Sequence, residues 1–228
     1  MNRGVYVTGT DTGAGKSLAA ATLLAALNAH GVRSVGMKPV ASGCERTPAG
    51  LRNADAELLI AHSAGTPIYA NVNPYAFAEP IAPHLAAADV GIEIDLARID
   101  AAFAALSTNA QFLVVEGVGG WMAPLGPRLM QVDLVRALRL PVVLVVGLRL
   151  GCLNHALLSS RAIRADGAEL IGWIASSTDA QMARREDNLA TLRERLDAPC
   201  LGVLPHSAAP DPPVLAVHLG AACKRLLV

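Results

Sequence analysis

The segment from Val5 to Gly31 reads VYVTGTDTGAGKSLAAATLLAALNAHG. A short β-branched run is followed by a glycine-bearing loop, a Lys-Ser pair and an Ala/Leu-rich stretch that stops at a glycine. This order predicts a strand, a loop and then a helix. Backbone N–H groups and a helix N-terminus in such a loop point at phosphate oxygens. The segment therefore predicts a phosphate-binding loop that opens a nucleotide-binding domain.

The spacing within this loop is one residue longer than usual. The common pattern places four residues between its first glycine and the Gly-Lys-Ser/Thr ending, whereas five stand between Gly9 and Gly15. The extra residue lengthens the loop and removes no functional group: Lys16 still supplies a charge for the phosphates, and Ser17 supplies a hydroxyl for Mg²⁺. The competing interpretation is a flexible turn that carries a surface lysine.

The distribution of apolar residues predicts the fold class. Hydrophobic residues make up 53% of the 228 residues and occur as short Val/Leu/Ile runs, which is typical of strands buried on both faces. Strand-like segments at 5–9, 34–38, 112–117, 142–147, 170–175 and 200–205 alternate with helical patterns at 17–30, 54–63, 96–106, 131–138, 153–165 and 180–196. We therefore predict a doubly wound, mainly parallel α/β sheet flanked by helices, of the P-loop NTPase type.

Other features of the composition limit the classes of function. No repeat, linker or composition break divides the chain, so we expect one domain over residues 1–228, with a surface loop at 207–213. Basic and acidic residues balance at 19 each, which disfavours nucleic acid as a partner. The longest apolar run, 141–148, is too short to cross a bilayer, and the N-terminus lacks a signal-peptide pattern. We expect a cytoplasmic protein with small-molecule partners and reduced, packed cysteines.

Two charged residues stand at predicted strand ends, where ligands bind in open α/β sheets, and a third stands at the start of a predicted helix. Glu116 in FLVVEGVGG is the first candidate magnesium ligand, and its alternative is a strand-end glutamate facing solvent. Asp55 in LRNADAELL is the second candidate, and its alternative is a helix N-cap or first-turn acid. Lys38 in GMKPVASG is either a phosphate-binding charge or a surface lysine.

Six segments together resemble one family, the dethiobiotin synthetases. They are, in order, VTGTDTGAGKS, KPVASG, LRNADA, VNPYAFAEPIAPH, VVEGVGGWMAPL and LGCLNHALL. The resemblance runs from about Val5 to about Leu158, weakens toward the C-terminus, and includes the five-residue spacing of the loop. It implies ATP-dependent ring closure: 7,8-diaminopelargonic acid takes up CO2 as a carbamate, ATP phosphorylates the carbamate, and the second amine displaces phosphate to give dethiobiotin.

The resemblance also implies roles for individual residues. Lys16 and Lys38 would stabilise carbamate and γ-phosphate oxygens, and Thr12 and Ser42 would contact the same end of the site. Mg²⁺ would bind Ser17, Asp55 and Glu116. Nucleotide would be bound by Gly13, Ala14, Gly15, Lys16, Ser17, Leu18, Asp55, Glu116, Gly117, Gly119, Ser176, Pro205 and His206. The diamine would be bound by Thr12, Lys38, Ser42 and Gly119 and, across a homodimer interface, by Gly151, Cys152, Leu153 and Asn154.

Departures from the family pattern concern mainly the nucleotide. Ser176 stands where many members have an asparagine that reads adenine, Gly13 where they often have an acid, and Val118 where they have an alanine. We therefore expect weak discrimination among nucleotide bases. For His84 and His155 we expect packing or loop-shaping roles, as the proposed chemistry needs no histidine base.

Two other functional classes share this fold. A regulatory or assembly ATPase of the partitioning or metal-chaperone kind usually carries an extra lysine early in the loop, and the stretch TDT has none. A glutamine-dependent amidotransferase synthetase would need a glutaminase domain, for which we expect no room in 228 residues.

Overall fold

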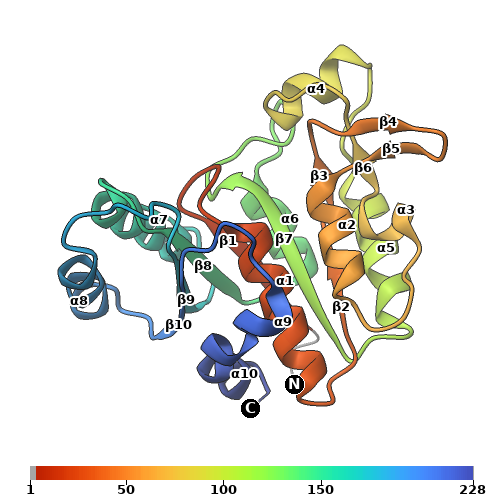
Figure 1. Cartoon of the computed structure of the whole chain (residues 1–228). Helices are drawn as coiled ribbons and strands as arrows, with labels where there is room; N and C mark the ends of the chain where they lie inside the picture. The colour runs from red at the N-terminus through yellow and green to blue at the C-terminus, as the bar shows by residue number, and fades with distance from the viewer. Residues whose placement is uncertain (1–3, 228) are drawn as a thin grey trace.

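A computed structural model describes residues 4–227 of the chain. Its central element is a six-stranded sheet with the order β10-β9-β8-β1-β7-β2, in which every neighbouring pair is parallel (Figure 1). The strands are β1 (Gly4–Gly9), β2 (Ser34–Met37), β7 (Phe112–Gly120), β8 (Val142–Gly147), β9 (Leu170–Ser176) and β10 (Cys200–Leu204). The predicted doubly wound parallel sheet is confirmed.

Helices cover both faces of the sheet, and this explains why its strands are apolar throughout. Val5 and Val7 of β1 belong to one core, and Tyr6 between them belongs to the other, because successive side chains point to opposite faces. The first core contains residues of α1 (Lys16–Ala29), α9 (Pro212–Leu215), the 3-10 helix η1 (Ala216–Leu219) and α10 (Gly220–Leu226). The second contains residues of α5 (Leu96–Ser107), α6 (Gln131–Leu138), α7 (Cys152–Ala165) and α8 (Arg185–Arg195).

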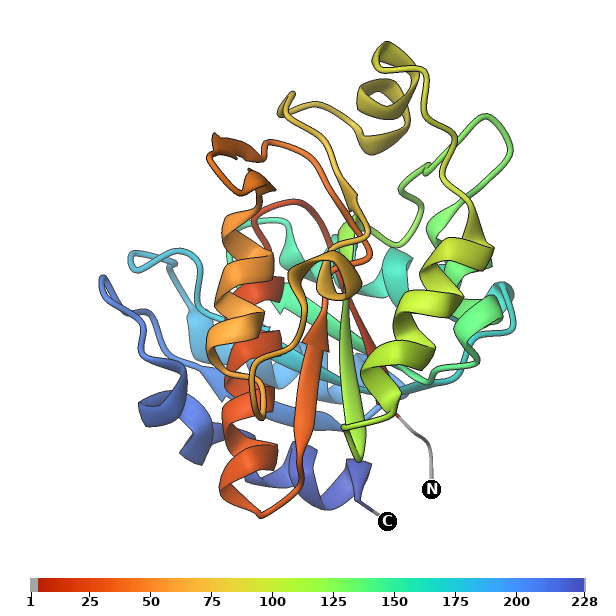
Figure 2. The same cartoon turned by 90° about the vertical axis from the view of Figure 1, so that its right-hand side faces the viewer.

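Short elements gather beside β2 and above the carboxyl ends of the strands. Figure 2 shows α2 (Ala54–Ala61) and α5 on opposite sides of β2 and β7. Figure 1 shows α4 (Pro83–Asp89) above the tip of β7 and the small strands to the right of that tip, above β2. These small strands are β3 (Val40–Ala41), β4 (Glu45–Thr47), β5 (Gly50–Arg52) and β6 (Tyr75–Ala76). The sequence did not predict them, nor the short helix α3 (Tyr69–Val72) in the same region. These segments form the outer walls of the site.

Two predicted boundaries were wrong. The last predicted helix begins at Arg185 instead of residue 180, because Arg184 adopts a left-handed conformation with φ 55°. The proline-rich stretch predicted as a loop ends early, because Pro212 and Pro213 open α9. Proline is favoured at the start of a helix, where its missing N–H costs no hydrogen bond.

The remaining structural expectations concern cysteines and membranes. Cys44, Cys152 and Cys223 are buried, Cys200 is half-buried, and all four are free thiols, as expected. Burial raises the pKa of the Cys44 and Cys223 thiols. Within residues 4–227, no helix has the length and apolar character needed to cross a bilayer.

Candidate active site

A cavity of about 770 Å³ lies at the carboxyl ends of β1, β2 and β7. The phosphate loop, the residues after β2, the start of α2, the end of β7 and the segment before α4 form its walls. This volume is within the usual range for small-ligand sites. Its lining includes these predicted site residues: Thr12, Gly13, Gly15, Lys16, Ser17, Leu18, Lys38, Ser42, Asp55, Glu116 and Gly119.

The phosphate loop is shaped by contacts with neighbouring strands. Thr10 N donates to the Val145 carbonyl of β8 at 2.9 Å, which fixes the start of the loop. Gly15 forms the N-cap of α1 with φ 87°, and a Cβ there would collide with Ser176 Oγ at the end of β9. Glycine is required at this position both for the left-handed conformation and for the close approach. The N-terminus of α1 therefore opens into the cavity.

Lys16 is held against its own loop. Its side chain is buried, and Nζ donates to the Asp11 carbonyl at 3.1 Å. Burial, followed by the positive charge of Lys38, lowers the pKa of Lys16 to about 8. A phosphate group in the cavity would favour the charged form of this lysine.

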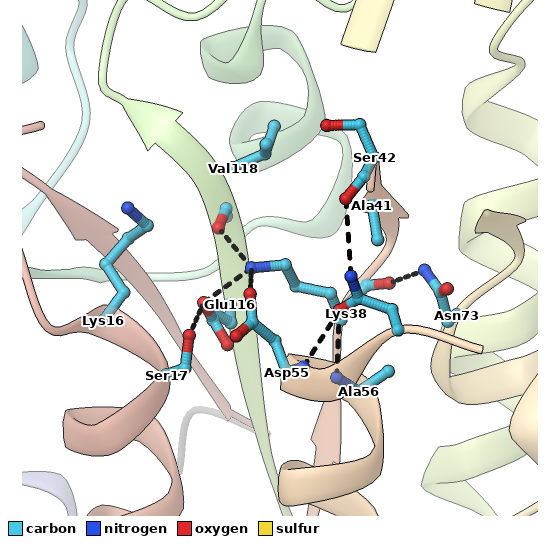
Figure 3. Close-up of polar contacts among 12 residues, drawn as sticks. Lys16, Ser17, Lys38, Ala41, Ser42, Asp55, Ala56, Asn73, Glu116 and Val118 are labelled. Atoms are coloured by element: carbon cyan, nitrogen blue, oxygen red, sulfur yellow. Dashed lines mark hydrogen bonds and ion pairs between the residues drawn. The ribbon is translucent and has the colours of Figure 1, made fainter. Parts of the chain in front are cut away.

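Lys38 lies at the centre of a buried charge cluster (Figure 3). Its Nζ is 2.6 Å from Glu116 Oε1, 2.9 Å from Asp55 Oδ2 and 3.3 Å from the Gly117 carbonyl oxygen. Ser17 Oγ donates to Glu116 Oε1 at 2.8 Å. Lys38 is 4% exposed and Glu116 is fully buried. The alternatives of a surface lysine and a solvent-facing glutamate are therefore both wrong.

The ionisation of this cluster follows from burial and mutual attraction. Burial alone would lower the pKa of Lys38, but the charges of Glu116 and Asp55 raise it above the ordinary value. Burial raises the pKa of Glu116 in spite of the opposing effect of Lys38. For Asp55, burial acts upward, but the charge of Lys38 brings the pKa below the ordinary value.

Asp55 reaches the cluster from the first turn of α2. The N-cap of this helix is Asn53, whose Oδ1 accepts from Asp55 N at 3.1 Å and from Ala56 N at 3.2 Å. Asp55 is therefore a first-turn acid and also faces the cavity, so the two interpretations of this residue are compatible. Asn53 lines the cavity as well and was missed, although an asparagine before an Ala-Asp helix start is a recognisable cap.

The oxygens of this cluster suit Mg²⁺. Ser17 Oγ, Asp55 and Glu116 gather at one wall, and Glu116 Oε2 is buried without a hydrogen-bond partner. Mg²⁺ prefers oxygen ligands and in nucleotide sites binds one or two carboxylates together with phosphates. Among residues 4–227, no group of three or more His, Cys, Asp or Glu side chains forms a metal site, so phosphates would have to complete this one.

The residues expected to bind the base lie behind the phosphate loop, outside the cavity lining. Ser176 is buried against Gly15. Pro205 and His206 follow β10, and His206 Nδ1 is 3.2 Å from the Ser177 carbonyl oxygen. Ala14 is buried within the loop, and Gly117 faces Lys38 through its carbonyl oxygen.

The residues expected to bind the substrate carboxylate also lie outside the cavity lining, at the start of α7. The N-cap of α7 is Gly151, so Asn154 is the third helical residue. Asn154 is exposed, as are Leu150 (96%) and Leu158 (57%) at spacings of four residues. Arg149 joins this region to the phosphate loop through a 2.6 Å ion pair with Asp11.

Comparisons with known proteins give consistent matches. Residues 3–214 match the AAA domain family. The chain is 60% identical to an ATP-dependent dethiobiotin synthetase of Xanthomonas oryzae pv. oryzae over 200 residues, which cover 88% of this chain and 89% of that protein. It is 54% identical to an enzyme of the same name from Xylella fastidiosa over 215 residues, 94% of this chain and 95% of that protein.

Solved structures with low sequence identity share the fold. The MinC:MinD cell division protein complex of Aquifex aeolicus includes a chain with a TM-score of 0.62 at 14% identity, covering 99% of this chain and 96% of that one. The signal recognition particle receptor FtsY of Elizabethkingia anophelis has a TM-score of 0.54 at 14% identity, covering 99% of this chain and 66% of that one. At these identities the likeness establishes the fold only.

Proposed function

The chain belongs to the family of ATP-dependent dethiobiotin synthetases, and we propose that it converts 7,8-diaminopelargonic acid and CO2 into dethiobiotin while ATP becomes ADP and phosphate. The observation that carries this proposal is the position of Lys38. Its ammonium group and the hydroxyl of Ser17 in the phosphate loop contact the same oxygen, Glu116 Oε1, and Lys38 lines the same cavity as Lys16. A carbamate formed in this cavity would lie near two cations. Lys38 is suited to the carbamate itself, and Lys16 is suited to the phosphoryl group that is transferred to it.

The reaction has three steps. One amine attacks CO2, forming a C–N bond and losing a proton to give a carbamate. A carbamate oxygen then attacks the γ-phosphorus, and the bond to ADP breaks. The second amine attacks the carbonyl carbon, phosphate leaves and the nitrogen loses a proton to the phosphate or to water, which closes the cyclic urea.

The chain contributes mainly charge and orientation to these steps. Lys16 and the N–H groups at the start of α1 face the phosphates, and stabilisation of a transferring phosphoryl group by such groups is worth several kcal/mol. Thr12 and Ser42 line the same cavity and orient the carbamate.

We propose that Ser17, Asp55 and Glu116 hold Mg²⁺, which when bound neutralises charge on the nucleotide phosphates. The buried, unpartnered Glu116 Oε2 supports this assignment. The ammonium group of Lys38 pairs with both carboxylates. With Mg²⁺ on these carboxylates, the ammonium group would pair with the carbamate.

We also propose that the enzyme is a homodimer in which Gly151, Cys152, Leu153 and Asn154 of one subunit bind the substrate carboxylate of the other. A helix N-terminus is suited to a carboxylate. Leu150 and Leu158 are exposed, and so is Met122 (62%), which follows the end of β7 by two residues. These three side chains offer apolar surface for a second copy of the chain. We further propose that residues 1–228 form one domain and that the enzyme is cytoplasmic, with small molecules and not nucleic acid as its other partners.

A turnover assay tests the proposed function. ADP release should require both the diamine and bicarbonate, and mass spectrometry should detect dethiobiotin in equal amount. A Lys16→Ala variant serves as the control for contaminating ATPases. ADP release that ignores the diamine but responds to a protein or membrane would instead indicate a regulatory ATPase.

A further inference from the structure

The end of β7 departs from regular pairing with β1. Val7 pairs with Glu116, but Gly9 pairs with Gly120, so three residues of β7 stand opposite Thr8 alone. A bulge of this kind removes backbone groups from the hydrogen-bond ladder, and buried backbone groups need other partners. Two of these three residues, Val118 and Gly119, line the main cavity, as does Gly120, which pairs with Gly9.

The side chain of Gln131 supplies these partners. Its Oε1 accepts from Val118 N at 2.8 Å, and its Nε2 donates to the Gly120 carbonyl at 2.8 Å and to Thr8 Oγ1 at 3.2 Å. The side chain is completely buried at the first residue of α6. Only one orientation of the amide satisfies the Val118 N–H, so Gln131 joins the two strands at fixed positions.

Gln131 is also packed tightly against the residue that follows Glu116. A Cβ on Gly117 would collide with Gln131 Oε1 and would lie 2.7 Å from Tyr6 Oη. The peptide group between Gly117 and Val118 is bound at both ends: its N–H donates to Gln131 Oε1, and its carbonyl oxygen, that of Gly117, accepts from Lys38 Nζ at 3.3 Å. The position of the Gln131 amide is therefore transmitted through one glycine to the Lys38 and Glu116 charge cluster.

We infer that Gln131 is a positioning residue for the substrate end of the site. It does not line the cavity, but it holds the Val118–Gly120 wall and the peptide that Lys38 contacts. The inference rests on the proposed synthetase function for its kinetic consequence. Gln131 contacts β1 at Thr8, before the phosphate loop begins, so its replacement leaves the loop that grips the phosphates in place.

The test compares Gln131→Met with a matched control, Asn28→Leu. Methionine keeps the length of glutamine but removes the acceptor of Val118 N and leaves the Gly120 carbonyl with Ala123 N, at 3.1 Å, as its donor. Asn28 also makes three side-chain hydrogen bonds, to Ser34 N, Ser34 Oγ and the His62 carbonyl. It lies at the opposite end of α1 from Lys16.

Two measurements distinguish positioning from a merely structural role. In Gln131→Met we expect kcat/KM for the diamine to fall at least tenfold, while the dissociation constant for ADP measured without Mg²⁺, which reports the phosphate loop, stays within about threefold. Amide hydrogen exchange in residues 117–121 should be at least ten times faster than in the wild type. Asn28→Leu should show neither change, although its unfolding midpoint is lowered to a similar extent.

The inference is overturned if Gln131→Met keeps kcat/KM within threefold, or if both variants lose activity equally. Failure of the proposed function would appear separately, as absence of dethiobiotin formation by the wild type. In that case the exchange rates still decide: faster exchange confined to residues 117–121 in Gln131→Met supports the positioning role, and unchanged exchange overturns it.

Discussion

Replacement of Lys38 by methionine tests the charge cluster independently of any assigned activity. Methionine fills most of the space of the lysine stem but removes the ammonium group that Glu116 contacts at 2.6 Å and Asp55 at 2.9 Å. Glu116 is fully buried and would keep only the hydroxyl of Ser17, at 2.8 Å, as a partner. Asp55 is 40% exposed and would be compensated by water.

The structure gives the size of the effect. Removing one partner of a buried ion pair costs about 3 to 5 kcal/mol, since the other charge is left uncompensated. Because Glu116 keeps its hydrogen bond with Ser17, we expect the cost in Lys38→Met to lie near the lower end of this range, at about 3 kcal/mol in the free energy of unfolding at pH 8. In Lys38→Met/Glu116→Gln the buried charge is gone, so the double variant should be more stable than the sum of the single losses by about 2 kcal/mol.

The loss should also depend on pH. Burial raises the pKa of Glu116, and the opposing effect of Lys38 is absent in the variant. A carboxyl whose pKa is higher in the folded state binds a proton more readily there than when unfolded. The resulting stability is present at low pH and is lost as the pH rises through the folded-state pKa. The difference between wild type and Lys38→Met should therefore be smaller at pH 5 than at pH 8.

Urea unfolding, followed by the fluorescence of the two tryptophans, measures these free energies. Trp121 and Trp173 are both buried and will report global unfolding. A loss of 3 kcal/mol corresponds to a midpoint lowered by about 1 M for a denaturant slope of about 3 kcal/mol/M. A Lys38→Met variant within about 0.5 kcal/mol of the wild type at pH 8, or an additive double variant, would refute the buried pair.

Further predictions concern the nucleotide and the dimer. Lys16→Ala should reduce dethiobiotin formation by about a thousandfold or more with an unchanged unfolding midpoint, because it removes charge from the transferring phosphoryl group; near-normal turnover would exclude the proposed role. The pKa of Lys16 is about 8 and only its charged form attracts phosphate, so the dissociation constant for ADP should be constant below pH 8 and rise about tenfold per unit above it. Calorimetry that finds a flat profile to pH 9.5 would contradict this. Equal mixtures of Lys16→Ala chains with Leu153→Ala/Asn154→Ala chains should recover about a quarter of wild-type activity, since half of the dimers contain one intact site; no recovery, with subunit exchange shown, would place the site in one chain. Because the hydroxyl of Ser176 both donates and accepts, specificity constants for ATP, GTP and CTP should lie within about a hundredfold, and a ten-thousandfold preference for ATP would show that another group reads the base.

The sequence predicted the sheet because each of its strands is a short apolar run between loops. Val5 to Gly9 is such a run, and its neighbours in the sheet are buried on both faces in the same way. The short elements before α4 could not be predicted from periodicity. Strands such as β3, Val40–Ala41, contain too few residues to show a pattern, and they form only by pairing with distant residues of β6.

The site was predictable where function requires a local motif and unpredictable where it depends on packing. Gly15, Lys16 and Ser17 are adjacent in the sequence and were found together in the cavity lining. The pairing of Lys38 with Glu116 joins residues that are 78 positions apart, and no local pattern specifies it. Gln131 was missed for a similar reason, since a glutamine at a helix start is usually exposed and only the fold shows that it is buried.

The order of strands in the sheet has a consequence for synthesis of the chain on the ribosome. β1 lies between β7 and β8, so the phosphate loop follows a strand that gains its two neighbours only after residue 142 has been made. At 5–20 residues per second, about 7 to 27 s separate the emergence of Gly9 from that of Val142. During this interval the apolar residues of β1 and α1 lack most of their core partners. The nascent N-terminal segment is therefore a substrate suited to ribosome-associated chaperones, and the ATP site is assembled late in translation although its signature motif is made first.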